Sequence, residues 1–161
     1  MRLLAAFLIM LAFPLALKID RPIKKIKTFC VPGMGYCMEY NSRIFDRPKR
    51  DVDNYGAQVA SEKYEISGVF VAGVDAIQVS FEEYYQNLMA ELEKSSPTLE
   101  EKSTTITDDY FYLTVESDAV IHFYQAWRQN DRLVKLNLQA PKEIDPAIWT
   151  RAITDFRVQW R

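Results

Sequence analysis

Histidine, cysteine and glycine are scarce in this chain. Its 161 residues include one His, two Cys and five Gly. One imidazole and two thiols cannot supply four ligands to a standard zinc site, and they leave little material for a His-dependent triad. Nucleotide-binding loops, dinucleotide fingerprints and the Gly-x-Ser-x-Gly element are also missing from the sequence. We therefore expect a protein with no metal site, no cofactor and no enzymatic activity.

Net charge is small but unevenly distributed. The composition, with 48% hydrophobic residues, indicates one globular domain. The formal charge of −2 by itself says nothing about nucleic acid, and no nucleic-acid partner is expected. Residues 1–50 contain ten basic and three acidic residues, whereas residues 51–161 contain ten and nineteen. The basic stretch Lys18–Lys27 is either a solvated leader that folds back on the acidic body, or a contact for an anionic membrane surface or an acidic partner.

An apolar run precedes the basic stretch. It spans Leu3–Leu17 between Arg2 and Lys18, and it is shorter than the roughly 20 residues of a spanning helix. This pattern is typical of a signal peptide, which predicts cleavage after residues 1–17 and export to the periplasm or the extracellular space. An uncleaved anchor is the alternative. A lipid anchor is not expected, because Cys30 lies too far downstream.

Export gives the two cysteines a structural meaning. They flank a Pro32-Gly33 turn signal, and a hairpin in which Val31 pairs with Tyr36 places Cys30 opposite Cys37. In an oxidising compartment such a pair forms a disulfide. A redox-active pair would typically have Cys-x-x-Cys spacing, which this sequence lacks.

The hairpin belongs to a predicted leader over residues 18–62, whose part from 42 to 62 has few apolar residues and is interpreted as a linker. Two weaker interpretations apply there. Arg47–Arg50 resembles a dibasic processing site. Asp51–Glu62 resembles a calcium loop, but Tyr55 and Val59 occupy positions that normally supply metal ligands.

Residues 63–161 form the predicted α+β domain. Strands are expected near 64–71 and 77–81, and a helix follows, opened by the Ser80–Glu83 capping box. Four strands, at 99–107, 110–116, 119–128 and 132–139, have connections short enough for an antiparallel meander. A last helix is capped by Asp145 and extends past Phe156. The predicted fold is an antiparallel sheet of about six strands with helices packed on it, preceded by the disulfide hairpin.

Turn lengths assign the side chains to two faces. Two-residue turns at Ser117-Asp118 and Asn130-Asp131 pair Val115 with Val120 and Phe123 with Leu138. Both faces of the central strands are apolar, so both need cover. The first face carries Tyr112, Ile121, Phe123, Trp127, Val134, Leu136 and Leu138; the second carries Phe111, Leu113, Val115, Val120, His122 and Tyr124, with Lys102, Lys135 and Asn137 at its edge.

The order of elements over residues 64–160 resembles the PsbP-like superfamily, which includes photosystem II extrinsic proteins and DcrB-like periplasmic proteins. The resemblance lies in Ser80–Tyr85 at the start of the first helix, in Tyr124–Trp127 and Leu136–Pro141, and in the terminal helix. It implies an α/β/α sandwich and mainly non-enzymatic binding roles. It supplies no catalytic residues.

The expected function is an exported non-enzymatic module that contacts another protein, possibly as an immunity or inhibitor protein. The alternative is a carrier of a small apolar ligand or lipid between the sheet and a helix. An apolar centre with a polar rim is typical of a protein contact. The candidate contact residues are therefore those of the second face: Phe111, Leu113, His122, Tyr124 and Asn137. For His122, a half-buried structural role is the competing interpretation.

Overall fold

The computed structural model describes residues 25–30, 35–51, 56–74, 79–96 and 98–161. Within these residues it contains ten strands and two helices. They are β1 (Ile26–Cys30), β2 (Tyr36–Asn41), β3 (Lys49–Asp51), β4 (Gly56–Ser61), β5 (Ile66–Val74), α1 (Phe81–Ser95), β6 (Glu100–Ile106), β7 (Tyr110–Glu116), β8 (Val120–Gln129), β9 (Arg132–Pro141), α2 (Pro146–Thr154) and β10 (Arg157–Trp160). The signal peptide and its anchor alternative lie outside the described residues. Among those residues, no helix is long and apolar enough to cross a membrane.

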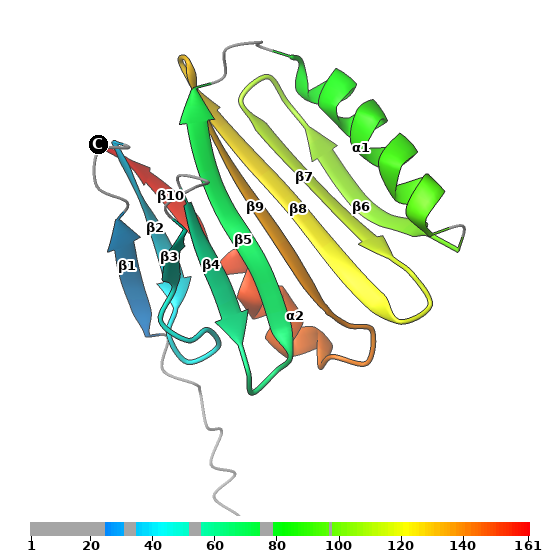
Figure 1. Cartoon of the computed structure of the whole chain (residues 1–161), viewed down its shortest axis with the longest axis horizontal. Helices are drawn as coiled ribbons and strands as arrows, with labels where there is room; N and C mark the ends of the chain where they lie inside the picture. The colour runs from blue at the N-terminus through cyan, green and yellow to red at the C-terminus, as the bar shows by residue number, and fades with distance from the viewer. Residues whose placement is uncertain (1–24, 31–34, 52–55, 75–78, 97) are drawn as a thin grey trace, which may run out of the picture.

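The strands form two antiparallel sheets. The larger has seven strands in the order β3-β4-β5-β9-β8-β7-β6, and the smaller has the order β1-β2-β10. Figure 1 shows α1 beside β6 and β7, α2 behind the large sheet, and the small sheet at the opposite side from α1. The chain is thus an α+β protein, as expected, and we name the two faces of its large sheet the α1 face and the α2 face.

The α2 face holds the larger hydrophobic core. Phe123, Val134, Leu136 and Leu138 are buried there together, which confirms the predicted first face. The small sheet and α2 cover them, and Tyr36 of β2 contacts Phe70 of β5 with ring centroids 5.6 Å apart. The other buried members of this core are Met38, Tyr40, Ile44, Phe45, Val59, Ile66, Ala72, Ala140, Trp149, Ala152 and Phe156.

The α1 face holds a smaller core. Phe111, Leu113 and Val115 of β7 are buried beneath α1, together with Phe81 and Ala126. The helix begins where the capping box predicts, because Ser80 Oγ accepts a hydrogen bond from Glu83 N at 3.1 Å. Residues 75–78 lie outside the described part. The strand expected to reach residue 81 is wrong at that end, since Phe81 is the first residue of the helix.

Strand register was predicted correctly on one side of β8 and wrongly on the other. Phe123 pairs with Leu138 as expected. Val115, however, pairs with His122 rather than Val120, because Ser117 N bonds to Val120 O at 2.9 Å and shifts the two-residue turn to 118–119. The displacement is two residues, and side chains alternate with a period of two. Every residue of β7 therefore keeps its predicted face.

The linker interpretation of residues 42–62 is wrong. Ile44 and Phe45 are buried in the main core, and residues 49–51 and 56–61 form β3 and β4 of the large sheet. In β4 the small residues Gly56, Ala57 and Ser61 allow close packing while contributing little hydrophobicity. Because this strand contains few large apolar residues, a search for apolar patterns does not detect it.

The first and last strands of the described chain, β1 and β10, lie on either side of β2 in the small sheet. Cys30 and Cys37 lie opposite each other in β1 and β2 and are joined by a disulfide, which confirms that prediction. The prediction that the last helix runs past Phe156 is wrong, because α2 ends at Thr154 and β10 follows and pairs with β2. Asn41 of β2 donates a hydrogen bond to the buried carboxylate of Asp155, at 2.8 Å.

Candidate functional site

A hollow of about 500 Å³ lies on the part of the α1 face formed by β4, β5, β9 and β8. Helix α1 packs over β7 beside it, and no other described helix lies on this face. Register aligns Gln58, Val69, Asn137 and Tyr124 in one row across the four strands. We call this region the open half; the side chains that the alternation places on it are Gln58, Ala60, Ser67, Val69, His122, Tyr124, Asn137 and Gln139.

Three of the five predicted contact residues meet in the open half. His122, Tyr124 and Asn137 line the hollow together. Phe111 and Leu113, both 0% exposed, lie beneath α1, where Phe111 contacts the ring of Tyr84 at 5.4 Å between centroids. The latter two are core residues, because the helix covers that part of the face.

The aromatic pair in the hollow is electrically neutral near pH 7. The rings of His122 and Tyr124 are nearly parallel, at 16°, with centroids 6.2 Å apart. Burial lowers the pKa of His122, since it penalises the imidazolium form, and it raises the pKa of Tyr124, since it penalises the phenolate. The pair therefore presents a flat, uncharged surface.

Around this pair the open half offers amides, a hydroxyl and one aliphatic side chain. Gln139 Nε2 donates to Ser67 Oγ at 3.1 Å. Asn137 Oδ1 is buried and has no hydrogen-bond partner within the described residues. Val69, the aliphatic member, is 37% exposed. The described lining of the hollow includes no charged side chain.

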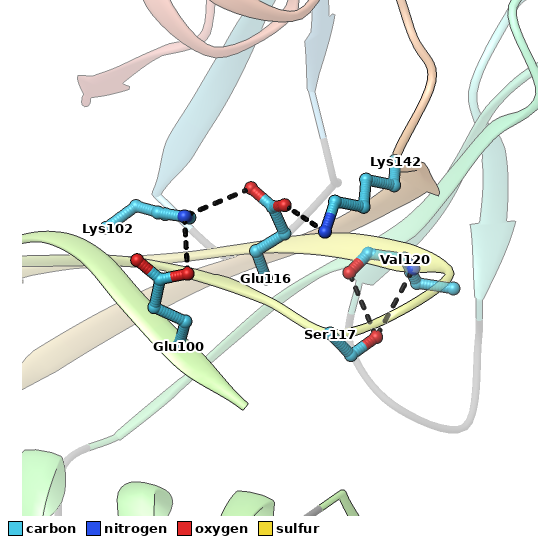
Figure 2. Close-up of polar contacts among 6 residues, drawn as sticks. All are labelled: Glu100, Lys102, Glu116, Ser117, Val120 and Lys142. Carbon is cyan, nitrogen blue, oxygen red and sulfur yellow. Dashed lines mark hydrogen bonds and ion pairs between the residues drawn. The ribbon is translucent and has the colours of Figure 1, made fainter. Parts of the chain in front are cut away.

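Charged residues lie at the margins of the sheet. Lys135 Nζ lies 4.4 Å from the centre of the Tyr84 ring, where α1 meets the open half. Lys102, expected at the edge of this face, instead bonds to Glu100 at 2.7 Å and contacts Glu116 at 3.7 Å (Figure 2). Glu116 alternates with Tyr112 on the α2 face. A register shift between Glu101 and Ser103 explains why simple alternation misplaces Lys102.

Sequence reasoning missed the contribution of β4 to the open half. Gln58 and Ala60 point to the exposed side while Ala57, Val59 and Ser61 are buried. Burial alternates over Ala57–Ser61, but the sequence has no matching alternation of apolar and polar residues that could have identified the strand. The calcium interpretation falls on the same segment. Residues 52–55 lie outside the described part, and the flanking residues form β3 and β4 rather than helices.

A second hollow, of about 450 Å³, lies on the α2 face. We call it the α2 cleft. It lies between α2 and the β6–β7–β8 end of the sheet, and its lining is Ser103, Tyr110, Tyr112, Thr114, Phe123, Gln125, Thr150, Ile153, Thr154 and Phe156. In the described ranges, no group of three or more His, Cys, Asp or Glu is placed to hold a metal ion.

The sheet with α1 and α2 on opposite faces defines a PsbP-like α+β fold. The chain is similar to the solution structure of cyanobacterial PsbP (CyanoP) from Synechocystis sp. PCC 6803, with a TM-score of 0.56 and 11% identity over 91% of this chain and all of that one. A crystal structure from Bacteroides thetaiotaomicron VPI-5482 has a TM-score of 0.49 and 13% identity, over 84% of this chain and 48% of that one. No protein-family model matches the sequence, and no curated protein matches it significantly. The DcrB-like part of the resemblance has no counterpart in these matches.

Proposed function

We propose that this chain is a non-enzymatic binding module that contacts another protein through the open half. The observation that carries the proposal is an uncharged surface of amides and aromatic rings around the exposed Val69. Interface centres are poor in charged residues and rich in aromatic ones, with a polar rim outside. Val69 and Asn137 occupy the middle of the aligned row, and Tyr124 lies at the end beside α1. Lys49, which pairs with Gln58, is an exposed residue at the other edge.

The partner is proposed to be an exported protein. The Cys30–Cys37 disulfide supports an oxidising compartment, and the apolar leader supports export to the periplasm or the extracellular space. Lys25 and Lys27, the described part of the basic leader, are exposed, so contact with an anionic membrane surface or an acidic partner stays a prediction. The finer form of the proposal is an immunity or inhibitor protein that blocks a toxin or a hydrolase.

Site-specific crosslinking tests the proposed surface. A photoreactive benzoylphenylalanine replaces Val69 in the exported protein, and a matched sample carries it at Ala90, an exposed position of α1. We expect one partner band from position 69 and none from position 90. Equal bands from both positions, or a band from position 90 alone, would contradict the proposal. Purified partner then tests the finer form, because an inhibitor must lower the activity of the enzyme it binds.

Affinity for the crosslinked partner should depend on Tyr124. Tyr is among the residue types enriched in interface hot spots, which carry most of the binding energy. Tyr124→Ala is expected to weaken binding more than it weakens folding, and His122→Ala should have a smaller effect of the same kind. Melting and calorimetric titration of both variants separate the two quantities. A loss of affinity that follows only the unfolded fraction would assign both residues to the core.

A second candidate function is a carrier of a small, largely apolar ligand. The α2 cleft favours it, because a volume of about 450 Å³ lies in the range of small-molecule sites, roughly 300–1,000 Å³. A carrier purified from its native envelope should retain its ligand. Native mass spectrometry should then detect an added mass that disappears on denaturation, and a preparation with the bare chain mass alone would count against this function.

A further inference from the structure

We infer that the α2 cleft recognises an uncharged ring compound that presents a hydrogen-bond donor and a hydrogen-bond acceptor on one edge, as a lactam does. The inference rests on the second candidate function, since it specifies the ligand class of the proposed carrier site. It is independent of protein binding at the open half, which lies on the other face of the sheet.

The acceptor for such a ligand is a buried amide. Gln125 lines the cleft and is only 8% exposed. Its Nε2 donates a hydrogen bond to the hydroxyl oxygen of Tyr110 at 2.6 Å, whereas its Oε1 is buried with no hydrogen-bond partner among the described residues. A buried acceptor left unpaired is costly, and native proteins usually satisfy it. A ligand donor in the cleft would satisfy Oε1.

The donor for the ligand is the hydroxyl of Tyr110. Because this oxygen already accepts from Gln125, its own hydrogen is available to an acceptor on a ligand. Burial raises the pKa of Tyr110, so the hydroxyl keeps its proton near neutral pH. Tyr110 and Gln125 thus present a linked donor and acceptor. An N–H beside a C=O on a ring is the simplest complement to both.

Aromatic rings line the cleft beside this polar pair. The rings of Tyr112 and Phe123 are 6.3 Å apart and inclined at 29°, and Tyr110 lies 6.1 Å from Tyr112. Ile153 and Phe156 also contribute to the lining. Flat aromatic side chains pack well against a planar ligand. The composition therefore favours a ring system over a flexible acyl chain.

The surrounding charges argue for an uncharged ligand. The described lining of the cleft includes no charged side chain. Asp155, between Thr154 and Phe156, accepts a hydrogen bond from Asn41. The members of an ionic cluster beside Ser103 and Thr114 are paired with one another. Figure 2 shows Glu116 between Lys102 and Lys142, with Lys142 at 2.6 Å. A charged ligand would have to lose water in the cleft without gaining a counter-ion.

Titration with 2-quinolone, a neutral bicyclic lactam, tests the inference. Its matched control is N-methyl-2-quinolone, which keeps the ring and the carbonyl but lacks the N–H donor. Binding is followed by two-dimensional NMR of the full chain. We expect the parent compound to shift signals of the cleft residues and the N-methyl compound to bind at least about tenfold more weakly, because it leaves Gln125 Oε1 unpaired.

Variants identify the side chains responsible. Tyr110→Phe and Gln125→Met should each reduce 2-quinolone affinity about tenfold and narrow the difference between the two compounds. Tyr85→Phe is the matched control, because the Tyr85 hydroxyl donates to Glu101 beside α1. This variant should leave the 2-quinolone affinity unchanged. Melting curves verify that each variant is folded. Equal affinity for both compounds in a folded protein would overturn the polar recognition while leaving the carrier function intact. Absence of binding by both compounds would overturn the inferred ligand class, whereas the carrier function itself is decided by the native mass spectrometry described above.

Discussion

On its α2 face the large sheet is covered over β4, β5, β9 and Phe123 of β8, whereas on its α1 face it is covered over β6, β7 and the Ala126 end of β8. The first cover consists of the small sheet and α2, and the second is α1. Each cover therefore leaves the opposite half of the sheet less protected. The open half and the α2 cleft occupy those two regions, diagonally across the sheet.

The staggered covers make one strand serve both regions. In β8, Tyr124 lines the open half, while Phe123 and Gln125 on either side of it line the α2 cleft. Successive strand residues point to opposite faces, so a single strand can supply two chemically different surfaces. Because β8 is an interior strand between β9 and β7, both surfaces are fixed to one hydrogen-bonded element.

The largest difference between the two faces is expected when neighbouring residues of β8 are truncated. Phe123→Ala removes a ring from the larger core, and we expect a loss of about 3–5 kcal/mol in the free energy of unfolding. Tyr124→Ala should cost less, because that ring is only half-buried. Denaturant unfolding measures both. Equal losses would mean that the open half is packed as tightly as the core.

The next largest effect is expected where the small sheet meets α2. Asn41→Ala removes a donor from the buried carboxylate of Asp155, which should cost about 1–3 kcal/mol in unfolding free energy. Glu39→Ala is the control, since its hydrogen bond to Gln159 is exposed, and it should change stability by no more than about 0.5 kcal/mol. A larger loss of stability in Glu39→Ala than in Asn41→Ala would show that the hydrogen bond between Asn41 and Asp155 does not stabilise the contact between the small sheet and α2.

A smaller effect should appear in the pH dependence of stability. Burial lowers the native pKa of His122, so the unfolded chain binds its proton more readily. Stability should rise with pH between that lowered pKa and the unfolded value of about 6.5, and fall as pH decreases through the same window. In the His122→Gln variant, the melting midpoint should change less between pH 7.5 and 5.5 than it does in the unmodified chain. An unchanged slope in that variant would assign the pH dependence to other groups.

The smallest effect concerns the exposed ion cluster. Lys142 and Lys102 lower the pKa of Glu116, so its contribution is present above the unfolded pKa and lost as pH falls through the native one. Lys142→Met should raise the Glu116 pKa in an NMR titration. Lys102→Met should raise it less, because that ammonium is 3.7 Å away rather than 2.6 Å. Added salt should reduce both differences.

Elements with strong local signals were predictable from the sequence. Ser80 and Asp145 cap α1 and α2, and the Asn130-Asp131 turn sets the β8–β9 register. These features depend on residues close together in the chain. The face assignments of β7 survived a register error because the error was an even number of residues.

Features that depend on distant pairing were not predictable. β10 owes its place to β2, which lies far away in the sequence. β4 pairs with its chain neighbours β3 and β5, and it was missed because it consists mainly of small residues. The candidate site shows the same division. His122 and Tyr124 follow from alternation within β8, whereas their meeting with Gln58 requires the order of four strands. Phe111 and Leu113 have the same alternation, and only the position of α1 shows that they are covered.

The pairing of β10 with β2 has a consequence for the order of folding. Glu39 and Gln159 are 120 residues apart in sequence, and Arg161 N bonds to Gly35 O at 2.8 Å. During synthesis, β2 therefore remains an unpaired edge on one side until residue 160 has been made. Contacts of such long range form slowly. The small sheet therefore closes only after every strand of the large sheet has been made.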